Sequence, residues 1–249
     1  MAGHSHWARI KRAKSVTDAR RGREWSRLAR AVIVAARTGG GDPDANLNLR
    51  YAIDAARDAN MPKDTIERAI KKGTGEGGGA ALEELVYEGY GPGGAAILCT
   101  ALTDNRNRTA PEIKKIFELR GGNLGATNSV AWLFKKRGVF IVASSKADED
   151  TLTGIALEAG ADDVQSLGDA FELTCEPTAF NAVLKALEAA GIKPESAEIT
   201  MVANTTVTLS GELADRMMKL IDALEEHDDV QAVHTNFETD EAEAERLSQ

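Results

Sequence analysis

The chain has 249 residues, of which 43% are hydrophobic and 28% are charged, a composition that suits one large folded domain or two to three small ones. Its apolar runs are far shorter than the ~18 residues of a membrane span, and no apolar stretch follows the basic start, so we expect neither a spanning helix nor an export signal. The two cysteines, Cys99 and Cys175, lie far apart in apolar runs, so we expect reduced core thiols in a cytoplasmic protein.

Charge is unevenly distributed along the chain, although the formal net charge is −9. Residues 1–80 contain 16 Lys and Arg against 9 Asp and Glu, whereas residues 81–249 contain 14 against 30. The contrast is sharpest at the start, where residues 1–37 contain 10 basic and 2 acidic side chains. This division predicts that the N-terminal end contacts a polyanion while the rest of the chain does not.

The first eighty residues predict a small bundle of four helices. A basic helix is expected through residues 10–22 and a second through residues 24–37, where apolar side chains recur every three to four positions. Residues 47–59 and 62–72 predict two more helices, and the glycine-rich segment 73–79 predicts a linker at a domain boundary. The side chains expected to face the core of this bundle are Trp25, Leu28, Val32, Ala35, Leu49, Ile53, Ala56, Ile66, Ala69 and Ile70.

The pattern of apolar residues changes after the linker. Residues 84–90 and 95–103 predict the two strands of a hairpin, joined by a Gly-Pro-Gly-Gly turn. Residues 108–121 predict a helix that ends at a glycine, and strands are expected at residues 130–134 and 138–144. A β-hairpin, a helix and further strands in this order predict a layered α+β domain.

The segment from Gly138 to about Ala203 predicts the order β-α-β-β-α-β, which is that of a ferredoxin-like unit. The strand, helix and strand that follow, within residues 205–238, are too few to bury a core alone. We therefore expect them to complete the domain that begins at residue 81. The polar tail, residues 239–249, is expected to be frayed.

The predicted fold class is α+β, with an N-terminal helical bundle followed by two ferredoxin-like α+β domains, one inserted into the other. The predicted domains are residues 1–80 for the basic helical domain, residues 81–134 plus 204–240 for a discontinuous α+β domain, and residues 135–203 for the inserted domain. We expect the chain to be a monomer.

No motif in the sequence predicts an active site. Two stretches match Gly-x-Gly-x-x-Gly, at residues 73–78 and 89–94, but neither lies between a strand and a following helix, as dinucleotide binding requires. His4 and His6 with a free N-terminal amine could bind Cu(II) or Ni(II), but a structural zinc site needs four ligands. We therefore expect no catalytic residue, no metal and no cofactor. A metal-dependent or hydrolytic enzyme that uses these histidines and scattered carboxylates is the alternative from another class.

The basic N-terminal segment predicts binding to phosphates. Its Lys and Arg side chains follow one another along a helix with few acidic neighbours, and such a helix gains free energy when it neutralises phosphates and releases their counterions. A merely solvated helix is the alternative, and Trp7 could either pack on the bundle or stack on a base. Arg106 and Arg108 predict a second anion contact near a helix N-terminus, unless Asp104 or Asn105 simply caps that helix.

Arginine without interleaved Asn or Gln favours contact with the nucleic-acid backbone over reading of the base sequence. Structured RNA, such as ribosomal RNA or tRNA, is therefore favoured over promoter DNA as the partner, and we expect no contact with a membrane. The residues that we expect to contact nucleic acid are Trp7, Arg9, Lys11, Arg12, Lys14, Arg20, Arg21, Arg23, Arg27, Arg30, Arg106 and Arg108.

Eight segments carry a resemblance to a known family, and they occur in this order: MAGHSHW, IKRAK, DARRG, VAARTGGGDPDAN, NMPKDTIERAIKKGTGE, YEGYGPGG, TDNRNRT and GGNLG. They closely resemble the YebC family of bacterial proteins and its relatives, the mitochondrial translational activators. The resemblance covers essentially the whole chain and implies a helical N-terminal domain and two α+β domains. His6 and Arg9 depart from the family's usual Lys and Asn, so the resemblance implies no role for a Lys ammonium at position 6.

The resemblance also implies a role in gene expression. Members of the family have been described as DNA-binding transcriptional regulators, and others act at the ribosome, where they relieve stalling or activate translation. We therefore expect a non-enzymatic, nucleic-acid-binding regulator of gene expression. A ribosome-associated translation factor that relieves stalling is the favoured form, and a transcriptional regulator that binds promoters is the alternative.

Overall fold

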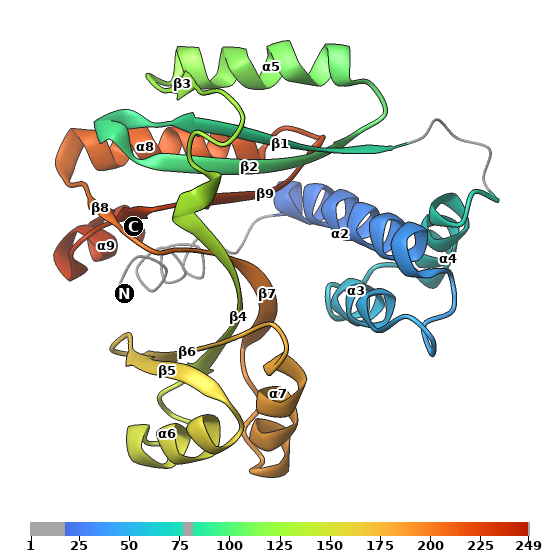
Figure 1. The fold of residues 1–249 in the computed structure, drawn as a ribbon, viewed down its shortest axis with the longest axis vertical. Helices are drawn as coiled ribbons and strands as arrows, with labels where there is room; N and C mark the ends of the chain where they lie inside the picture. The colour runs from blue at the N-terminus through green and yellow to red at the C-terminus, as the bar shows by residue number, and fades with distance from the viewer. Residues whose placement is uncertain (1–17, 77–81, 249) are drawn as a thin grey trace.

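The computed structural model describes residues 18–76 and 82–248. Figure 1 shows a group of helices from the first part of the chain and two sheets, each of which has helices on one face. The predicted α+β class is confirmed, because helices come first and antiparallel sheets follow. No helix among the described residues is both long enough and apolar enough to cross a membrane.

Three helices form the first part: α2 (Asp18–Gly39), α3 (Leu47–Asp58) and α4 (Lys63–Gly73). Helix α2 is continuous over 22 residues, so the prediction of separate helices through residues 10–22 and 24–37 is wrong from residue 18 onward. A single glycine in a helix interior, such as Gly22, costs only about 1 kcal/mol, and no proline or turn sequence accompanies it. The helix ends as predicted, where Gly40 has a positive φ of 88°.

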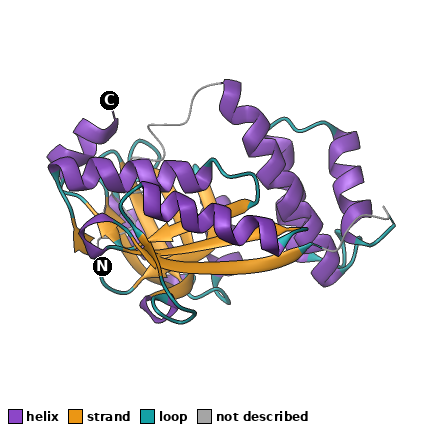
Figure 2. Ribbon diagram, turned by 90° about the horizontal axis from the view of Figure 1, so that it is seen from above, coloured by secondary structure: helices purple, strands orange, loops and turns teal. Residues whose placement is uncertain are grey.

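The core of the helical group follows the predicted periodicity. The side chains predicted to face it are either buried or packed against it. The buried Asn46 caps the start of α3, and its amide donates to the carbonyl oxygens of Ala35, 2.7 Å away, and Gly40, 2.8 Å away. The Trp25 indole N–H donates to the carbonyl oxygen of Ala59 at 2.9 Å, which ties α2 to the end of α3. Figure 2 shows this helical group beside the sheets.

The first sheet is antiparallel and has the strand order β3-β1-β2-β9. Its strands are β1 (Glu83–Tyr90), β2 (Ala96–Thr103), β3 (Asn123–Leu124) and β9 (Val230–Thr235), and its helices are α5 (Arg106–Leu119) and α8 (Gly211–Glu225). The short helix η1 (Pro92–Gly94) closes the predicted β1–β2 hairpin. Phe117, Met217 and Leu220 are fully buried between the sheet and its helices. Because β9 pairs with β2, the sheet is built from segments that lie before and after the second sheet in sequence.

The second sheet has the strand order β5-β6-β4-β7 and follows the predicted β-α-β-β-α-β course. Its elements are β4 (Phe134–Ala143), α6 (Glu149–Glu158), β5 (Ala161–Ser166), β6 (Ala170–Cys175), α7 (Phe180–Ala189) and β7 (Ser196–Ala203). Phe140 stacks on Phe180 with ring centroids 4.7 Å apart, within the core between the sheet and α6 and α7. This topology is that of a ferredoxin-like unit.

Residues 130–134 do not form the predicted strand. Val130 precedes a short helix, η2 (Ala131–Leu133), and a single strand, β4, begins at Phe134. The cause is the buried Glu88 carboxylate, which accepts the backbone N–H groups of Val130 and Ala131 at 2.8 and 2.7 Å. Donors that would otherwise serve a sheet ladder are therefore used to fold the segment into a turn.

The C-terminal tail is not frayed, because residues Glu241–Ser248 form helix α9. Ala244 is buried against the first core, and the Arg246 guanidinium lies 2.8 Å from Asp215 and 2.6 Å from Glu243. Two short strands precede this helix, β8 (Val207–Thr208) and β10 (Phe237–Glu238), and they pair in parallel. A few apolar residues in this polar segment, such as Ala244 and Leu247, are enough to pack α9 against the first core.

The two cysteines are buried and free, which confirms the prediction of core thiols. Burial raises the pKa of the Cys99 thiol to about 12 and that of the Cys175 thiol to about 11. Both thiols therefore stay protonated near neutral pH and behave as small apolar groups.

Candidate nucleic-acid interface

The residues predicted to contact nucleic acid lie in three places. Trp7, Arg9, Lys11, Arg12 and Lys14 lie outside the described residues, as do His4 and His6. Arg20, Arg21, Arg23, Arg27 and Arg30 all belong to α2. Arg106 and Arg108 lie in the first turn of α5, beside the first sheet. The structure therefore brings the described candidates onto two helices.

Helix α2 carries most of these arginines along one side. Positions 20, 23, 27 and 30 are spaced by three, four and three residues, which places them on one face of a helix. This face lies opposite the side that packs in the helical core, where Val32 is fully buried. The side of α2 that carries Arg27 and Arg30 is therefore directed away from the helical core.

The second half of this stripe is bound within the chain. The Arg27 guanidinium donates to the backbone carbonyl of Glu225 at the end of α8, where unpaired helix carbonyls attract a cation. The Arg30 guanidinium lies 3.7 Å from the Asp229 carboxylate, in the turn between α8 and β9. These contacts fix α2 against the first sheet. Arg27 and Arg30 thus orient α2, and positions 20, 21 and 23 precede the point of attachment.

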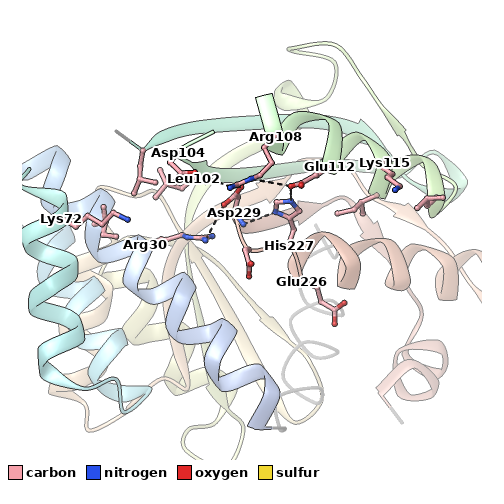
Figure 3. Close-up of a pocket in the computed structure, with 15 residues that line it drawn as sticks. Arg30, Lys72, Leu102, Asp104, Arg108, Glu112, Lys115, Glu226, His227 and Asp229 are labelled. Carbon is pink, nitrogen blue, oxygen red and sulfur yellow. Dashed lines mark hydrogen bonds and ion pairs between the residues drawn. The ribbon is translucent and has the colours of Figure 1, made fainter. Parts of the chain in front are cut away.

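Asp229 is the centre of this attachment, with a side chain only 7% exposed (Figure 3). Its Oδ2 accepts hydrogen bonds from the Arg108 guanidinium at 2.6 Å and from the Thr109 hydroxyl at 2.7 Å. The Thr109 hydroxyl also lies 2.8 Å from the buried Thr103 hydroxyl. Figure 3 shows Arg30 from α2 and Arg108 from α5 both pointing toward this carboxylate. The helical group and the first sheet therefore share one ion-pair network.

The network keeps Asp229 charged. Burial alone would raise the pKa of the Asp229 carboxyl, but the hydrogen bonds from Thr109 and Arg108 and the charge of Arg108 hold this pKa below its usual range. A buried carboxylate with paired donors is costly to neutralise or to truncate, because its partners would lose their acceptor. The attachment is therefore stable near neutral pH.

His227 extends the network toward α5. Its Nδ1 accepts the backbone N–H of Asp229 at 3.1 Å, so this nitrogen carries no proton. Its Nε2 lies 3.0 Å from Oε2 of Glu112 and donates a hydrogen bond to it. The imidazole thus joins the α8–β9 turn to α5 without needing a positive charge.

The two arginines of the predicted second contact point in different directions. Arg108 is turned inward to Asp229, and its guanidinium also lies 3.6 Å from Asp104. Arg106 is 67% exposed, and its guanidinium lies 3.6 Å from Glu83. The side chain of Asn105 accepts the backbone N–H of Arg108 at 3.1 Å, so the capping alternative holds for this residue. Arg106 is the more exposed of the two, since the Arg108 side chain is 47% exposed.

A cleft of about 880 Å³ lies beside the network, between the helical group and the first sheet. His227 lines it together with the charged residues Arg30, Lys72, Asp104, Arg108, Glu112, Lys115, Glu226, Asp228 and Asp229. Basic and acidic groups are interleaved there, so the cleft is not a uniform anion site. Among residues 18–76 and 82–248, no group of His, Cys, Asp and Glu has an arrangement that could hold a metal ion.

Sequence reasoning missed the role of Asp229. Its partners Arg108 and Thr109 are 121 and 120 positions away in sequence, and no local pattern marks such a pairing. The only sequence signal was the pair of arginines in the TDNRNRT segment, whose spacing suggested a functional turn. The structure assigns one of them to the attachment.

Comparison with known proteins gives consistent matches along the chain. The family model described as the TACO1/YebC protein N-terminal domain matches residues 5–76, and the model described as the TACO1/YebC second and third domain matches residues 82–237. A "probable transcriptional regulatory protein" of Pelotomaculum thermopropionicum is 54% identical, and the match covers 97% of this chain and 100% of that protein. A protein with the same description from Acidobacterium capsulatum is 50% identical over 98% of each chain.

A solved structure is also similar. The crystal structure of a conserved hypothetical protein from Aquifex aeolicus superimposes with a TM-score of 0.83 at 45% sequence identity. The match covers 92% of this chain and 94% of that chain. Fold and sequence therefore agree over nearly the whole length.

Proposed function

The chain belongs to the TACO1/YebC family, and on that premise we propose that it is a non-enzymatic regulator of gene expression that binds nucleic acid through its basic N-terminal region. The regulator role is supported by relatives 50–54% identical over nearly their whole length that are described as probable transcriptional regulatory proteins. The binding mode is inferred from charge and from the geometry of α2.

One observation carries the binding mode: residues 1–37 contain 10 basic and 2 acidic side chains, in a chain whose net charge is −9. Helix α2 continues this basic region without a break to Arg27 and Arg30, which attach it to the first sheet. Basic groups that precede a fixed attachment can meet a phosphate backbone while the acidic α+β part stays away from it. Each phosphate that they neutralise releases counterions, which favours binding at low salt.

Structured RNA is the target that this arrangement favours. The α2 stripe contains arginines without the Asn or Gln side chains that read adenine in a major groove. Contact with phosphates positions a protein on a nucleic acid but carries no sequence information directly. We therefore propose a translation factor that associates with ribosomal RNA or tRNA and relieves stalling.

A promoter-binding transcriptional regulator is the second candidate, and the description of the curated relatives favours it. Such a regulator binds its site roughly 10³-fold or more tightly than random DNA at one salt concentration. Binding to DNA without such a ratio, together with sedimentation of the protein with ribosomes, would exclude this second candidate.

Charge reversal tests the proposal. The triple variant Lys11→Glu, Lys14→Glu and Arg21→Glu should lose most of its affinity for a structured RNA such as tRNA while its far-ultraviolet circular dichroism stays unchanged. The slope of log affinity against log salt should also become shallower by about 2–3, because three phosphate contacts are lost. The matched control reverses three exposed lysines of the acidic part, Lys114, Lys193 and Lys219, and should change the affinity far less.

The same measurement has a clear contrary result. If the triple variant and the control bind tRNA with equal affinity and equal salt dependence, the basic N-terminal region is not the binding surface and the proposal is wrong.

A further inference from the structure

Trp132 lies in the η2 turn, next to the first sheet. Its side chain is 70% exposed, although the turn around it is well packed. Val130 before it and Phe134 after it are buried against Ala96 and Leu98 of β2. These two anchors fix both ends of the η2 turn, Ala131 and Leu133 pack against the same cluster, and Trp132 points outward. The exposure of the indole is therefore a consequence of how the turn is built.

Glu88 makes this turn rigid. Its carboxylate is only 5% exposed and accepts three backbone N–H groups, those of Asn128 at 2.6 Å, Val130 at 2.8 Å and Ala131 at 2.7 Å. Burial raises the pKa of Glu88, but these three hydrogen bonds outweigh it and hold the pKa below the usual range. A carboxylate thus holds the segment that carries the indole. Little conformational entropy remains to be lost when a ligand contacts it.

A second aromatic ring is anchored at the same point. The Trp132 indole N–H donates to the carbonyl oxygen of Ser129 at 3.1 Å, and the Tyr90 hydroxyl donates to the same oxygen at 3.0 Å. Tyr90 is 38% exposed. The polar edges of both rings are therefore satisfied within the chain, and what they offer a partner is their apolar surface.

The surrounding sequence is basic, although this half of the chain is acidic. Residues 119–147 contain five Lys and Arg and no Asp or Glu, whereas residues 81–249 as a whole contain 14 basic and 30 acidic side chains. Lys135 and Lys136 follow the turn directly on β4, and both are exposed. Arg137 pairs with Asp162 at 3.0 Å, so its charge is already partly neutralised within the chain.

An exposed aromatic ring with exposed lysines three and four positions further along the chain is a combination that suits single-stranded nucleic acid, because bases stack on the ring and phosphates meet ammonium groups. We propose that Trp132, with Tyr90, Lys135 and Lys136, forms a stacking contact for nucleic acid, which binds an unpaired nucleotide on the indole. This inference rests on the proposed function and adds to it a site that distinguishes single strands from duplexes. A protein-binding surface would be expected to have acidic or apolar residues around the indole. The basic residues found there instead favour a nucleic acid over a protein.

The test compares binding of a fluorescein-labelled oligo(U) 12-mer RNA and of a blunt RNA duplex of the same length to the full-length chain. Trp132→Ala should weaken oligo(U) binding roughly 10- to 100-fold, which is the usual effect of losing one stacked base. It should leave duplex binding nearly unchanged. Trp132→Phe, which keeps an aromatic face, should recover most of the affinity, and Leu119→Ala, which truncates another strongly exposed apolar side chain, should have no effect.

The results separate this inference from the proposed function. If Trp132→Ala binds oligo(U) as well as the wild-type chain does, the stacking contact at Trp132 is wrong. Loss of duplex or tRNA binding in the N-terminal triple variant would still support the proposed function. If Trp132→Ala keeps oligo(U) binding and loses only co-sedimentation with ribosomes, the indole does not bind a free single strand and the inference is likewise wrong. A wild-type chain that binds neither RNA would overturn both.

Discussion

Asp229 and Glu88 are both buried carboxylates that accept several hydrogen bonds, but they organise the molecule in different ways. Asp229 takes its partners from side chains on two helices, Arg30 on α2 in the helical group and Arg108 and Thr109 on α5. Glu88 takes its donors from the backbone of one neighbouring segment. The first joins parts of the chain, whereas the second shapes a single turn. The same chemical group thus fixes the orientation of α2 in one place and the exposure of Trp132 in another.

Truncation of Asp229 should give the largest effect. Asp229→Ala leaves the Arg30 and Arg108 guanidinium groups and the Thr109 hydroxyl without their acceptor, so we expect a loss of about 3–5 kcal/mol in the free energy of unfolding. Urea denaturation followed by circular dichroism measures it. The matched control is Asp228→Ala, which removes the exposed neighbouring carboxylate. Equal midpoints for the two variants would mean that Asp229 does not hold the parts together.

Glu172 provides a pH-dependent contrast to both carboxylates. Burial, with the charge of Asp163, raises the pKa of Glu172 to about 7, and within the described part of the chain its Oε2 has no hydrogen-bond partner. A glutamate in an unfolded chain titrates near 4.3, so the stability that the protonated form gives is complete below that value and is lost as pH rises through about 7.

The variant Glu172→Gln should therefore be more stable than the wild type at pH 8, by roughly 3–4 kcal/mol, and the difference should nearly vanish by pH 4. Asp229 and Glu88 have lowered pKa values, so their stability is present above about pH 4 and is lost as pH falls further. Thermal unfolding from pH 4 to pH 8 distinguishes the two behaviours, with Glu198→Gln on β7 as an exposed control. A difference that does not depend on pH would contradict this assignment.

Neutralising Glu88 should have a smaller effect that stays local. Glu88→Gln keeps the shape of the side chain but offers the three backbone N–H groups only one good acceptor, so we expect a loss of about 1–3 kcal/mol. The change should alter the fluorescence of Trp132, read in a background with both Trp7→Phe and Trp25→Phe, without loosening α2 from the first sheet. Glu84→Gln, on the exposed part of the same strand, is the control. An unchanged emission spectrum would show that Glu88 does not set the position of the indole.

Removal of Arg106 should have the smallest effect on stability. Its guanidinium is 67% exposed and pairs only loosely with Glu83, so Arg106→Ala should change the free energy of unfolding by less than about 0.5 kcal/mol. If Arg106 contacts nucleic acid, the same variant should weaken tRNA binding. A large loss of stability would show instead that Arg106, like Arg108, belongs to the attachment.

Elements set by local periodicity were predictable from the sequence. Leu49, Ile53 and Ala56 repeat at helical spacing and are buried, and the order of elements in residues 138–203 is as expected. The turn at residues 130–134 was not predictable in this way, because its apolar residues resemble a strand and Glu88, which folds it, lies 42 positions from Val130.

The candidate site was less predictable than the fold. Composition pointed to α2 and to the Arg106–Arg108 turn, but it could not separate an arginine that faces solvent from one that pairs with Asp229. That distinction depends on side chains more than a hundred positions apart. The exposed Trp132 was overlooked because alternating apolar residues suggested that it belonged to a strand.

The salt dependence of tRNA binding tests the central claim most directly, because it counts the phosphates that the protein neutralises. For the wild-type chain, log affinity should fall linearly with log salt, with a slope that corresponds to several contacts at about 0.7 to 0.9 each. The slope of a chain that lacks residues 1–17 should be shallower by about 3, since Arg9, Lys11, Arg12 and Lys14 are removed. Equal slopes for the two chains would contradict the assignment of phosphate binding to the basic N-terminal region.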